Sequence, residues 1–431
     1  EGRIAALLDG TTGAAADVVV DGRERLLCAG FVDAHVHMRD PGLTHREDYA
    51  SGTRAAAVGG VTTVMCMPNT DPPIDSVERV HTTAATGNGR AHVDFTLQAT
   101  IPASLEPDMA AIWTAGITSF ETSLADGQEG VGTDRLDDPA RLLDVLRVAG
   151  GLDATVGILA GSQPITDRLT TDLRAAGAAD SRAFAAARPP ITEALGIAVL
   201  VEAARETGAR LVFRQVTTAR GLELLRRARA ELGAARIGVE LCPHNLHLTL
   251  DAVDRVGPWA QIIPPLRAEA DVAAARSALA EGTADFVGSD HAPHAPHEKE
   301  GLTAWDARNG TPGLDTFAAA VLDLALAGHV PLSRVAEVLG TAPARVFGIA
   351  DRKGSLEPGR DGDLVLVDPD AVRVVAPGMI LSKPGRSAFE GVRLRGWPVL
   401  TVLRGEVVAE AGDLVGAPRG RFLARGSQPE R

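Results

Sequence analysis

Lysine is nearly absent from this chain of 431 residues. Only Lys299, Lys353 and Lys383 occur, so arginine carries most of the positive charge. A carboxylated lysine is therefore impossible within the first 298 residues.

Cysteine is scarce too, and long apolar runs are missing. Cys28, Cys66 and Cys242 are scattered, odd in number and without a CxxC spacing, which excludes a disulfide framework and is typical of reduced thiols in the cytoplasm. We find no apolar run that we expect to span a bilayer, and no basic-then-apolar start that indicates export. These absences predict a cytoplasmic protein with no membrane partner.

The charge and the length exclude further classes. A formal net charge of −13 argues against nucleic acid or an anionic membrane surface as partner. At this length, one barrel-sized domain with a smaller satellite fits better than three equal domains.

The most informative stretch is GFVDAHVHMRDPG at residues 30–42. On a β-strand, His35 and His37 project from the same face, so both imidazoles can bind one metal ion. The alternative is an ordinary buried strand whose histidines are satisfied by hydrogen bonds, because an isolated HxH motif is weak evidence. Arg39 follows two residues after His37, so on a continued strand it would point to the same face as the histidines. Pro41-Gly42 ends the strand.

After this stretch, strands and helices alternate up to about residue 350. The first predicted strand runs from residue 30 through His37 and is ended by Pro41-Gly42. The other predicted strands are 61–67, 91–100, 116–120, 155–159, 210–213, 236–242 and 284–288. The predicted helices are 46–58, 76–86, 105–115, 139–148, 191–207, 219–232, 271–280, 316–326 and 332–339. This rhythm predicts an α/β fold with parallel strands, either a (β/α)₈ TIM barrel or an open doubly wound sheet.

We favour the barrel because polar side chains follow many predicted strands. In a barrel these strand ends converge on one mouth, whereas an open sheet scatters them. The residues concerned are His37, Asn69, Glu121, Gln215, His244 and Asp290. We expect the barrel to cover 30–350. Residues 1–29, with β-like runs at 4–8, 17–20 and 25–28, and residues 351–431 should pair into a small β-sandwich satellite domain, followed by a tail.

Six ordered motifs carry a family resemblance. The chain resembles the cyclic amidohydrolases, which include dihydroorotases, allantoinases and hydantoinases, and it is most similar to dihydroorotases of pyrimidine biosynthesis. The motifs are HVHMRDPG at 35–42, MPNT at 67–70, CPHNL at 242–246, PPLR at 264–267, SDHAPH at 289–294 and PRGRF at 418–422.

The resemblance implies a zinc site at the barrel mouth. His35, His37 and Asp290 match the ligands of the first ion, and Asp290 also matches the catalytic proton carrier. Glu121 stands where the family has a bridging carboxylated lysine, although another register would offer Asp126.

The second ion lacks ligands. The fifth strand ends at Leu159 with no histidine after it, and Gln215 replaces the histidine of the sixth strand. His247 is a speculative substitute. We expect one zinc ion per chain.

The resemblance also implies a substrate. Arg39, Asn69 and His294 match residues that grip the substrate carboxylate in dihydroorotases, and a guanidinium suits a carboxylate. The alternative is that Arg39 pairs with Asp40 or Glu47. Ile263 stands where the family commonly has asparagine, so we expect a small cyclic amide or ureido acid that is dihydroorotate-like but not necessarily dihydroorotate.

Three functions remain open from the sequence. The first is a one-metal hydrolase, the second an inactive scaffold for a partner such as aspartate transcarbamoylase, and the third a module that binds a small acid without turnover. We expect a homo-oligomer, a dimer or a tetramer. We also expect the polar loop 297–310 to cover or border the mouth and to be more mobile than the barrel strands.

Overall fold

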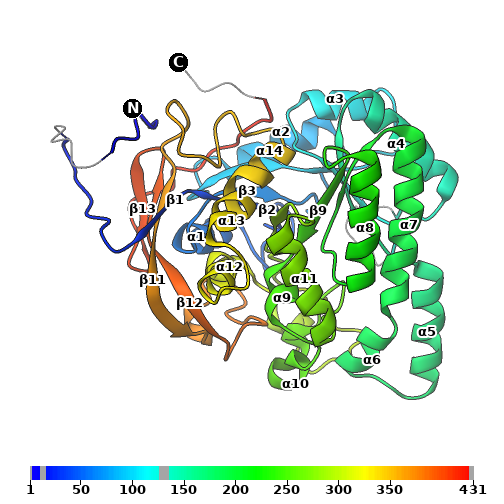
Figure 1. The fold of residues 1–431 in the computed structure, drawn as a ribbon. Coiled ribbons are helices and arrows are strands. Elements are labelled where there is room, and N and C mark those ends of the chain that lie inside the picture. The colour runs from blue at the N-terminus through cyan, green and yellow to red at the C-terminus, as the bar shows by residue number, and fades with distance from the viewer. Residues whose placement is uncertain (1, 10–15, 126–134, 427–431) are drawn as a thin grey trace.

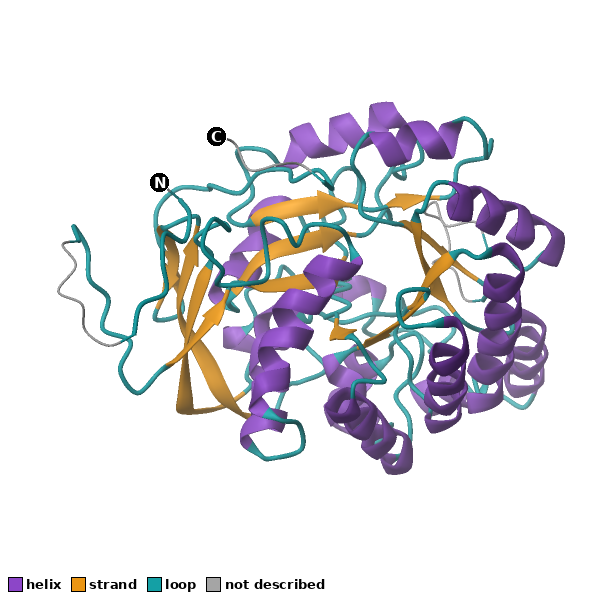
Figure 2. Ribbon diagram, turned by 45° about the horizontal axis from the view of Figure 1, so that its top comes forward, coloured by secondary structure: helices purple, strands orange, loops and turns teal. Residues whose placement is uncertain are grey.

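A parallel β-barrel lies at the centre of the molecule. The structure, a computed structural model, describes residues 2–9, 16–125 and 135–426, and Figures 1 and 2 show strands surrounded by helices. The barrel strands are β2 (Phe31–Val36), β3 (Val61–Cys66), β4 (Asp94–Leu97) with β5 (Ala99–Thr100), β6 (Phe120–Ser123), β7 (Thr155–Leu159), β8 (Arg210–Phe213), β9 (Ile237–Leu241) and β10 (Phe286–Val287).

Two parallel sheets join to close the barrel. One has the order β2-β3-β4 and the other β10-β9-β8-β7-β6-β5. β4 and β5 are one strand interrupted at Gln98, and a parallel bridge between Val36 and His291 joins the two remaining edges. The predicted (β/α)₈ TIM barrel is therefore confirmed, and the carboxyl ends of its strands meet at one mouth.

Most of the predicted helices form, because their apolar residues recur at helical spacing and cover the strands. The helices are α1 (Tyr49–Val58), α2 (Val77–Gly87), α3 (Asp108–Thr114), α4 (Pro139–Gly151), α5 (Gln163–Ala175), α6 (Ser181–Ala186), α7 (Pro190–Thr207), α8 (Ala219–Leu232), α9 (Pro243–His247), α10 (Ala252–Val256), α11 (Glu269–Glu281), α12 (Phe317–Leu326), α13 (Leu332–Ala336) and α14 (Ala342–Val346). Helices α5, α6, α9, α10 and α14 were not predicted from the sequence. In α5 only Thr166 is fully buried, so the helix has no strong apolar stripe to detect.

The two ends of the chain build the satellite β domain. β1 (Leu26–Ala29), β11 (Leu364–Val374), β12 (Arg393–Leu403), β13 (Glu406–Glu410) and β14 (Asp413–Leu414) form one antiparallel sheet in that order. α1 and α12 of the barrel contact β12, which fixes the domain beside the barrel.

The predicted strands at 4–8 and 17–20 were wrong. In the described residues the first forms no strand, although Ile4 makes backbone hydrogen bonds with Arg360 and Gly359 next to an isolated bridge between Arg3 and Asp361, and the second pairs with no strand. Val18 and Val19 are 78% and 81% exposed, so they gain neither a hydrogen-bonded neighbour nor a buried face.

The C-terminal tail returns to the barrel and ties it to the β domain. The amide of Phe95 donates to the carbonyl of Arg421, and the amide of Arg421 donates to Asp94. Asp94 also pairs with Lys353, a buried lysine that bridges to Asp361 and Asp363 beside β11.

One stretch meets a length and apolarity test for crossing a membrane, contrary to the sequence-based expectation. It is Ser181–Thr207, which spans α6 and α7, and 56% of its apolar window is buried inside the molecule. α7 packs against α4 and α8, as a helix of a barrel wall does, so this signal is weak.

Candidate active site

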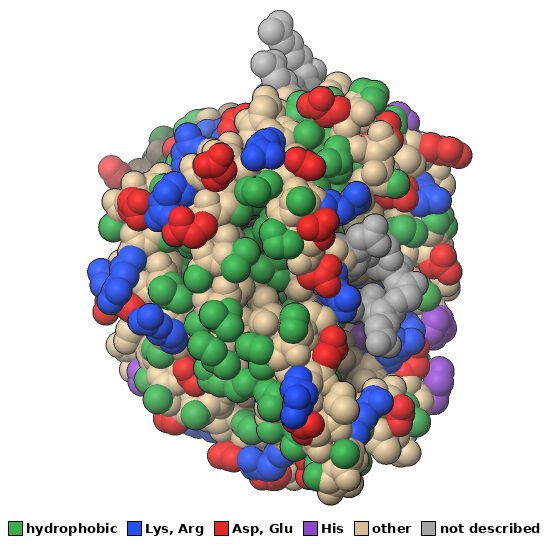
Figure 3. Space-filling model, turned by 90° about the vertical axis from the view of Figure 1, so that its right-hand side faces the viewer, with side chains coloured by type: hydrophobic (Ala, Val, Ile, Leu, Met, Phe, Trp, Pro, Cys, Tyr) green, Lys and Arg blue, Asp and Glu red, His purple; other side chains and the backbone are tan. Residues whose placement is uncertain are grey.

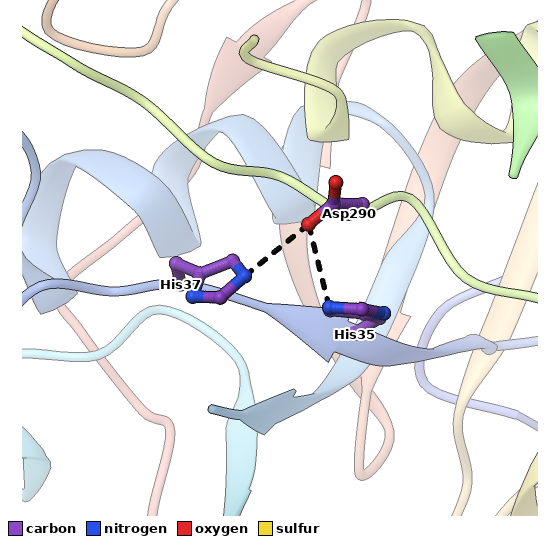
Figure 4. A group of neighbouring side chains, drawn as sticks. All are labelled: His35, His37 and Asp290. Atoms are coloured by element: carbon purple, nitrogen blue, oxygen red, sulfur yellow. Dashed lines mark hydrogen bonds and ion pairs between the residues drawn. The ribbon is translucent and has the colours of Figure 1, made fainter. Parts of the chain in front are cut away.

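Three side chains meet at the barrel mouth. His35 is the last residue but one of β2, His37 follows the strand, and Asp290 lies after β10; Figure 4 shows both imidazoles turned toward the carboxylate. The Nε2 atoms of His35 and His37 lie 3.3 and 3.2 Å from Oδ1 of Asp290, and one ligand atom of each residue lies within 4.8 Å of the others. Two imidazole nitrogens and one carboxylate oxygen suit zinc. The predicted ligands of the first ion are therefore together and fit a metal.

Glu240 on β9 orients His35. Its Oε1 lies 2.7 Å from Nδ1 of His35, so the imidazole presents Nε2 to the centre of the group. Burial alone lowers the pKa of His35, but Glu240 and Asp290 outweigh it and raise the pKa. A carboxylate behind a ligating histidine is the usual support of a metal site.

Burial and neighbouring charges also shift the pKa values of His37 and Asp290. Burial, and then the charge of Arg39, holds the pKa of His37 well below its ordinary value, so this imidazole is neutral. A metal requires neutral imidazole. Burial raises the pKa of Asp290 to about 6. Its Oδ2 accepts a 2.5 Å hydrogen bond from Nε2 of Gln215, which thus supports the carboxylate from β8.

The structure does not bring Glu121 into this group. Its two carboxylate oxygens accept hydrogen bonds from Arg214, with Nη2–Oε1 and Nε–Oε2 distances of 2.5 and 3.1 Å. Ser119 donates a third, at 2.5 Å. The alternative, Asp126, lies outside the described residues. Glu121 is therefore an ion-pair partner in this structure, although it also lines the cavity.

The speculative ligand His247 is wrong. Its Nε2 lies 2.7 Å from the carbonyl of Ala320 on α12, on the helical layer of the barrel. Leu159 lines the cavity without a histidine beside it, as the sequence predicted. In the described residues, the one histidine–carboxylate group with metal-ligand spacing is that of His35, His37 and Asp290.

A cavity of about 310 Å³ opens above the three residues. Asn69 and His294 line it, but Arg39 does not. Arg39 is 1% exposed and lies behind His294, with 3.3 Å between its Nη2 and the imidazole Nε2. His294 also lies 2.9 Å from the carbonyl of Asn309. Two of the three predicted carboxylate-binding residues thus face the cavity, and the third supports one of them.

The outer wall comes from helices that the sequence analysis missed and from the predicted loop. α5 and α6 contribute Thr166, Arg174 and Phe184, and the loop contributes its residues 305–310. The prediction that the loop 297–310 borders the mouth is therefore confirmed.

Lys299 fixes the inner side of this loop. Its ammonium donates to the carbonyls of Arg308 and Gly310 at 2.8 and 2.7 Å, and burial lowers its pKa to about 7.

Sequence reasoning missed Arg214 and Glu240. Arg214 is buried among the strands and pairs with Glu240 as well as Glu121. The sequence could have indicated Glu240, since it is the one charged residue within the otherwise apolar run Ile237–Leu241. Arg214 gave no such signal, because it follows the last residue of the predicted strand 210–213.

Comparison with known proteins agrees with this geometry. The amidohydrolase family pattern matches residues 26–408. A dihydroorotase of Halobacterium salinarum is 36% identical over 393 residues, covering 91% of this chain and 88% of its own length. An allantoinase of Rubrobacter xylanophilus is 35% identical, covering 94% and 88%.

A solved structure is similar throughout. The L-hydantoinase (dihydropyrimidinase) from Arthrobacter aurescens superposes with a TM-score of 0.94 at 31% identity, over 98% of this chain and 94% of its own. The chain therefore belongs to the amidohydrolase family. Within that metal-dependent family it is a cyclic amidohydrolase, a hydrolase of cyclic amide C–N bonds.

Proposed function

We propose that this chain opens or closes the ring C–N bond of a small cyclic amide or ureido acid that carries a carboxylate, with one zinc ion per chain. The observation that carries the proposal is the meeting of His35, His37 and Asp290 at the floor of a cavity. A bound zinc ion supplies Lewis acidity, which favours attack by water at neutral pH and polarises a carbonyl.

The protein residues divide the remaining work. Asp290, with its other oxygen held by Gln215, accepts the proton of the attacking water and returns it to the leaving ring nitrogen. His35 and His37 hold the ion, and Glu240 keeps His35 in its orientation. In ring closure, Asp290 carries the proton in the opposite direction.

The charge of the cavity supports an anionic substrate. Six arginines and four carboxylates are among the described residues that line it, in a chain with a net charge of −13: Arg46, Arg135, Arg174, Arg188, Arg214 and Arg308 against Glu121, Asp167, Asp290 and Asp306. Asn69 and His294 offer polar groups between this wall and the ligand group, and Arg39 stands behind His294. A carboxylate placed there meets positive charge and donors together.

The test is a panel of substrates with zinc-loaded protein. Dihydroorotate and its ring-opened ureido acid carry the required carboxylate, whereas allantoin and an unsubstituted hydantoin do not. We expect the acids to give the higher kcat/KM. Equal or higher kcat/KM for the neutral compounds would refute the carboxylate assignment, and no turnover of any compound would refute the activity.

A second candidate is an inactive scaffold that binds a partner such as aspartate transcarbamoylase. The hydrogen bond from Gln215 to Asp290 favours it, because this bond satisfies Oδ2 of the carboxylate without an ion. Native mass spectrometry separates the two candidates. A scaffold would lack zinc, turn over none of the panel and bind the transcarbamoylase with fixed stoichiometry.

We further propose a homo-oligomer in the cytoplasm. Ile191, Leu195 and Val199 form an exposed apolar stripe on α7, and Figure 3 shows hydrophobic side chains gathered on this side of the molecule among charges of both signs. Charges of both signs around an apolar centre fit a second copy of the same surface. The three free thiols agree with a reducing compartment.

A further inference from the structure

We infer that Arg214 is the second cation of this active site: it stands where the charge of a second metal ion would otherwise be required, and it positions the first ion through Glu240 and His35. The inference rests on the proposed one-metal function and assigns roles to Arg214 and Glu121 that the family resemblance does not give.

The contacts of Arg214 use every edge of its guanidinium. On one side Nε and Nη2 bind Glu121 of β6, and on the other Nη1 lies 2.5 Å from Oε2 of Glu240. Nη1 also lies 3.3 Å from the carbonyl of Ala34 on β2, one residue before His35. The ring of Phe347 lies 4.9 Å from the guanidinium carbon. Arg214 thus joins β2, β6 and β9 beneath the ligand group.

The charges require this cation. Glu121, Glu240 and Asp290 are three carboxylates that are at most 5% exposed. A buried carboxylate without a partner is strongly unfavourable, so a compensating cation must be present. Burial alone lowers the pKa of Arg214, but Glu121 and Glu240 outweigh it and raise the pKa, so the guanidinium is permanently charged.

The surrounding backbone leaves room for this network. A Cβ atom on Gly157 of β7 would lie 2.2 Å from Oε2 of Glu121. A Cβ on Gly288 would lie 2.9 Å from both Oε2 of Glu240 and Cβ of His35. Two glycines therefore give the carboxylates the space to lie flat against the strands, directed toward Arg214.

Glu240 connects the two cations. One of its oxygens binds Arg214 and the other binds Nδ1 of His35, so the guanidinium fixes the carboxylate that fixes the metal ligand. Glu121, by contrast, gives both oxygens to Arg214. Arg214 is accordingly a positioning residue, and Glu121 neutralises it without binding the ion.

The first experiment measures metal stoichiometry and affinity in the wild type and in Glu121→Gln, by elemental analysis and by competition with a chromophoric chelator for zinc. We expect one ion per chain in both, with affinities within about threefold. Two ions in the wild type, or a loss of tenfold or more in Glu121→Gln, would overturn the inference and leave the proposed hydrolase intact. No ion in the wild type would overturn both.

The second experiment compares Glu121→Gln with the double variant Glu121→Gln/Arg214→Met, which removes one negative and one positive charge together and so limits misfolding. We expect zinc affinity to fall a further 10- to 100-fold, since Glu240 loses its anchor. The visible spectrum of the cobalt-loaded double variant should change because His35 shifts.

The matched control is Arg229→Met, which breaks another largely buried arginine–carboxylate pair, with Asp285, outside the ligand group. It should lose stability but keep the zinc affinity and the cobalt spectrum. Unchanged affinity and spectrum in the double variant would overturn the positioning role, as would an equal change in the control.

Discussion

A single carboxylate, Glu240, links the ligand His35 to the cation Arg214. It is fully buried, and burial alone raises its pKa, but Arg214 and His35 outweigh this and lower it. Its charge is therefore present throughout the physiological range, and the direction of the His35 ring depends on it.

Glu240→Gln should weaken zinc binding by about 10- to 100-fold, because the amide keeps the shape but not the charge that orients His35. Competition with a chelator measures the loss. The control is Glu193→Gln, a buried carboxylate that binds the backbone and hydroxyls of Thr217 and Thr218 and no ligand histidine. Equal losses in both variants would show a general effect of buried charge instead.

Arg39 tests the substrate at the same scale. Arg39→Met should leave zinc content unchanged and weaken binding of an acidic substrate by at least about tenfold, because His294 loses both the charge and the hydrogen-bond partner behind it. The guanidinium acts through, or together with, His294, which it contacts. Isothermal titration with dihydroorotate measures the effect. If Arg39→Met binds the acid normally, Arg39 has a structural role and no role in substrate binding.

At the scale of elements, Lys353 connects the barrel to the satellite β domain. It is fully buried, and its Nζ lies 2.6, 2.9 and 2.8 Å from carboxylate oxygens of Asp94, Asp361 and Asp363. Burial alone lowers its pKa, but the three carboxylates outweigh it and raise the pKa. The cluster joins β4 to the start of β11.

Lys353→Met should destabilise the fold by about 3–5 kcal/mol, because it leaves buried carboxylates without their cation. Since the folded pKa is raised, the stabilisation is complete below the unfolded pKa of about 10.4 and is lost as the pH rises through the folded value. Urea denaturation at pH 8 and pH 11 measures the free energy of unfolding of both proteins. The difference in this free energy between wild type and variant should be smaller at pH 11.

The control for this prediction is Lys383→Met. That lysine pairs with Asp48 at the surface, at 2.6 Å and with 31% of its side chain exposed. Its replacement should lower the free energy of unfolding by less than about 1 kcal/mol. Two outcomes would contradict the role of the cluster. One is a loss of unfolding free energy in Lys353→Met as small as that in the control, and the other is a loss that does not change with pH.

At the scale of the whole molecule, the sequence was sufficient for the barrel and for the ligand group. Most barrel strands are short apolar runs bounded by turns, and HVH and SDH lie at the ends of predicted strands, which must converge. The fourth strand was predicted at 116–120 but forms at Phe120–Ser123, where polar residues follow the phenylalanine. The pairing of Glu121 with Arg214 could not be predicted, since it depends on which way one long side chain turns inside the barrel. Helix α5 was not predicted for a different reason: its contacts bury few apolar residues, so its sequence carries no clear apolar stripe.

In the satellite domain too, a strand's own residues predict it only in part, because its partner strand lies far away in the sequence. β1 was predicted from its own residues, and it pairs with β11 some 340 positions later, in the register Leu26 to Val367. Residues 17–20 have the same apolar character but find no partner strand, so they remain exposed. Apolar composition predicts a strand only where another strand is available to pair with it.

The last prediction concerns association of whole chains. Ile191, Leu195 and Val199 of α7 are 52%, 44% and 48% exposed, four residues apart, and so form one stripe along the helix. α5 packs beside α7, and exposed charges of both signs accompany them, as in the Arg168–Asp172 and Arg205–Glu231 pairs. Two copies related by a twofold axis can bury the stripe and match these charges.

Leu195→Glu should therefore convert the oligomer into monomers of 44.8 kDa at micromolar concentration, with association weakened by at least about 100-fold, since a carboxylate would be buried at the centre of the interface. Light scattering coupled to size-exclusion chromatography measures the mass. The control is Leu332→Glu on α13, which is 45% exposed and lies on a different helix. Because both positions are partly exposed in one chain, neither variant should lower the melting temperature much. A monomeric wild type, or dissociation by the control alone, would contradict the assignment of this face.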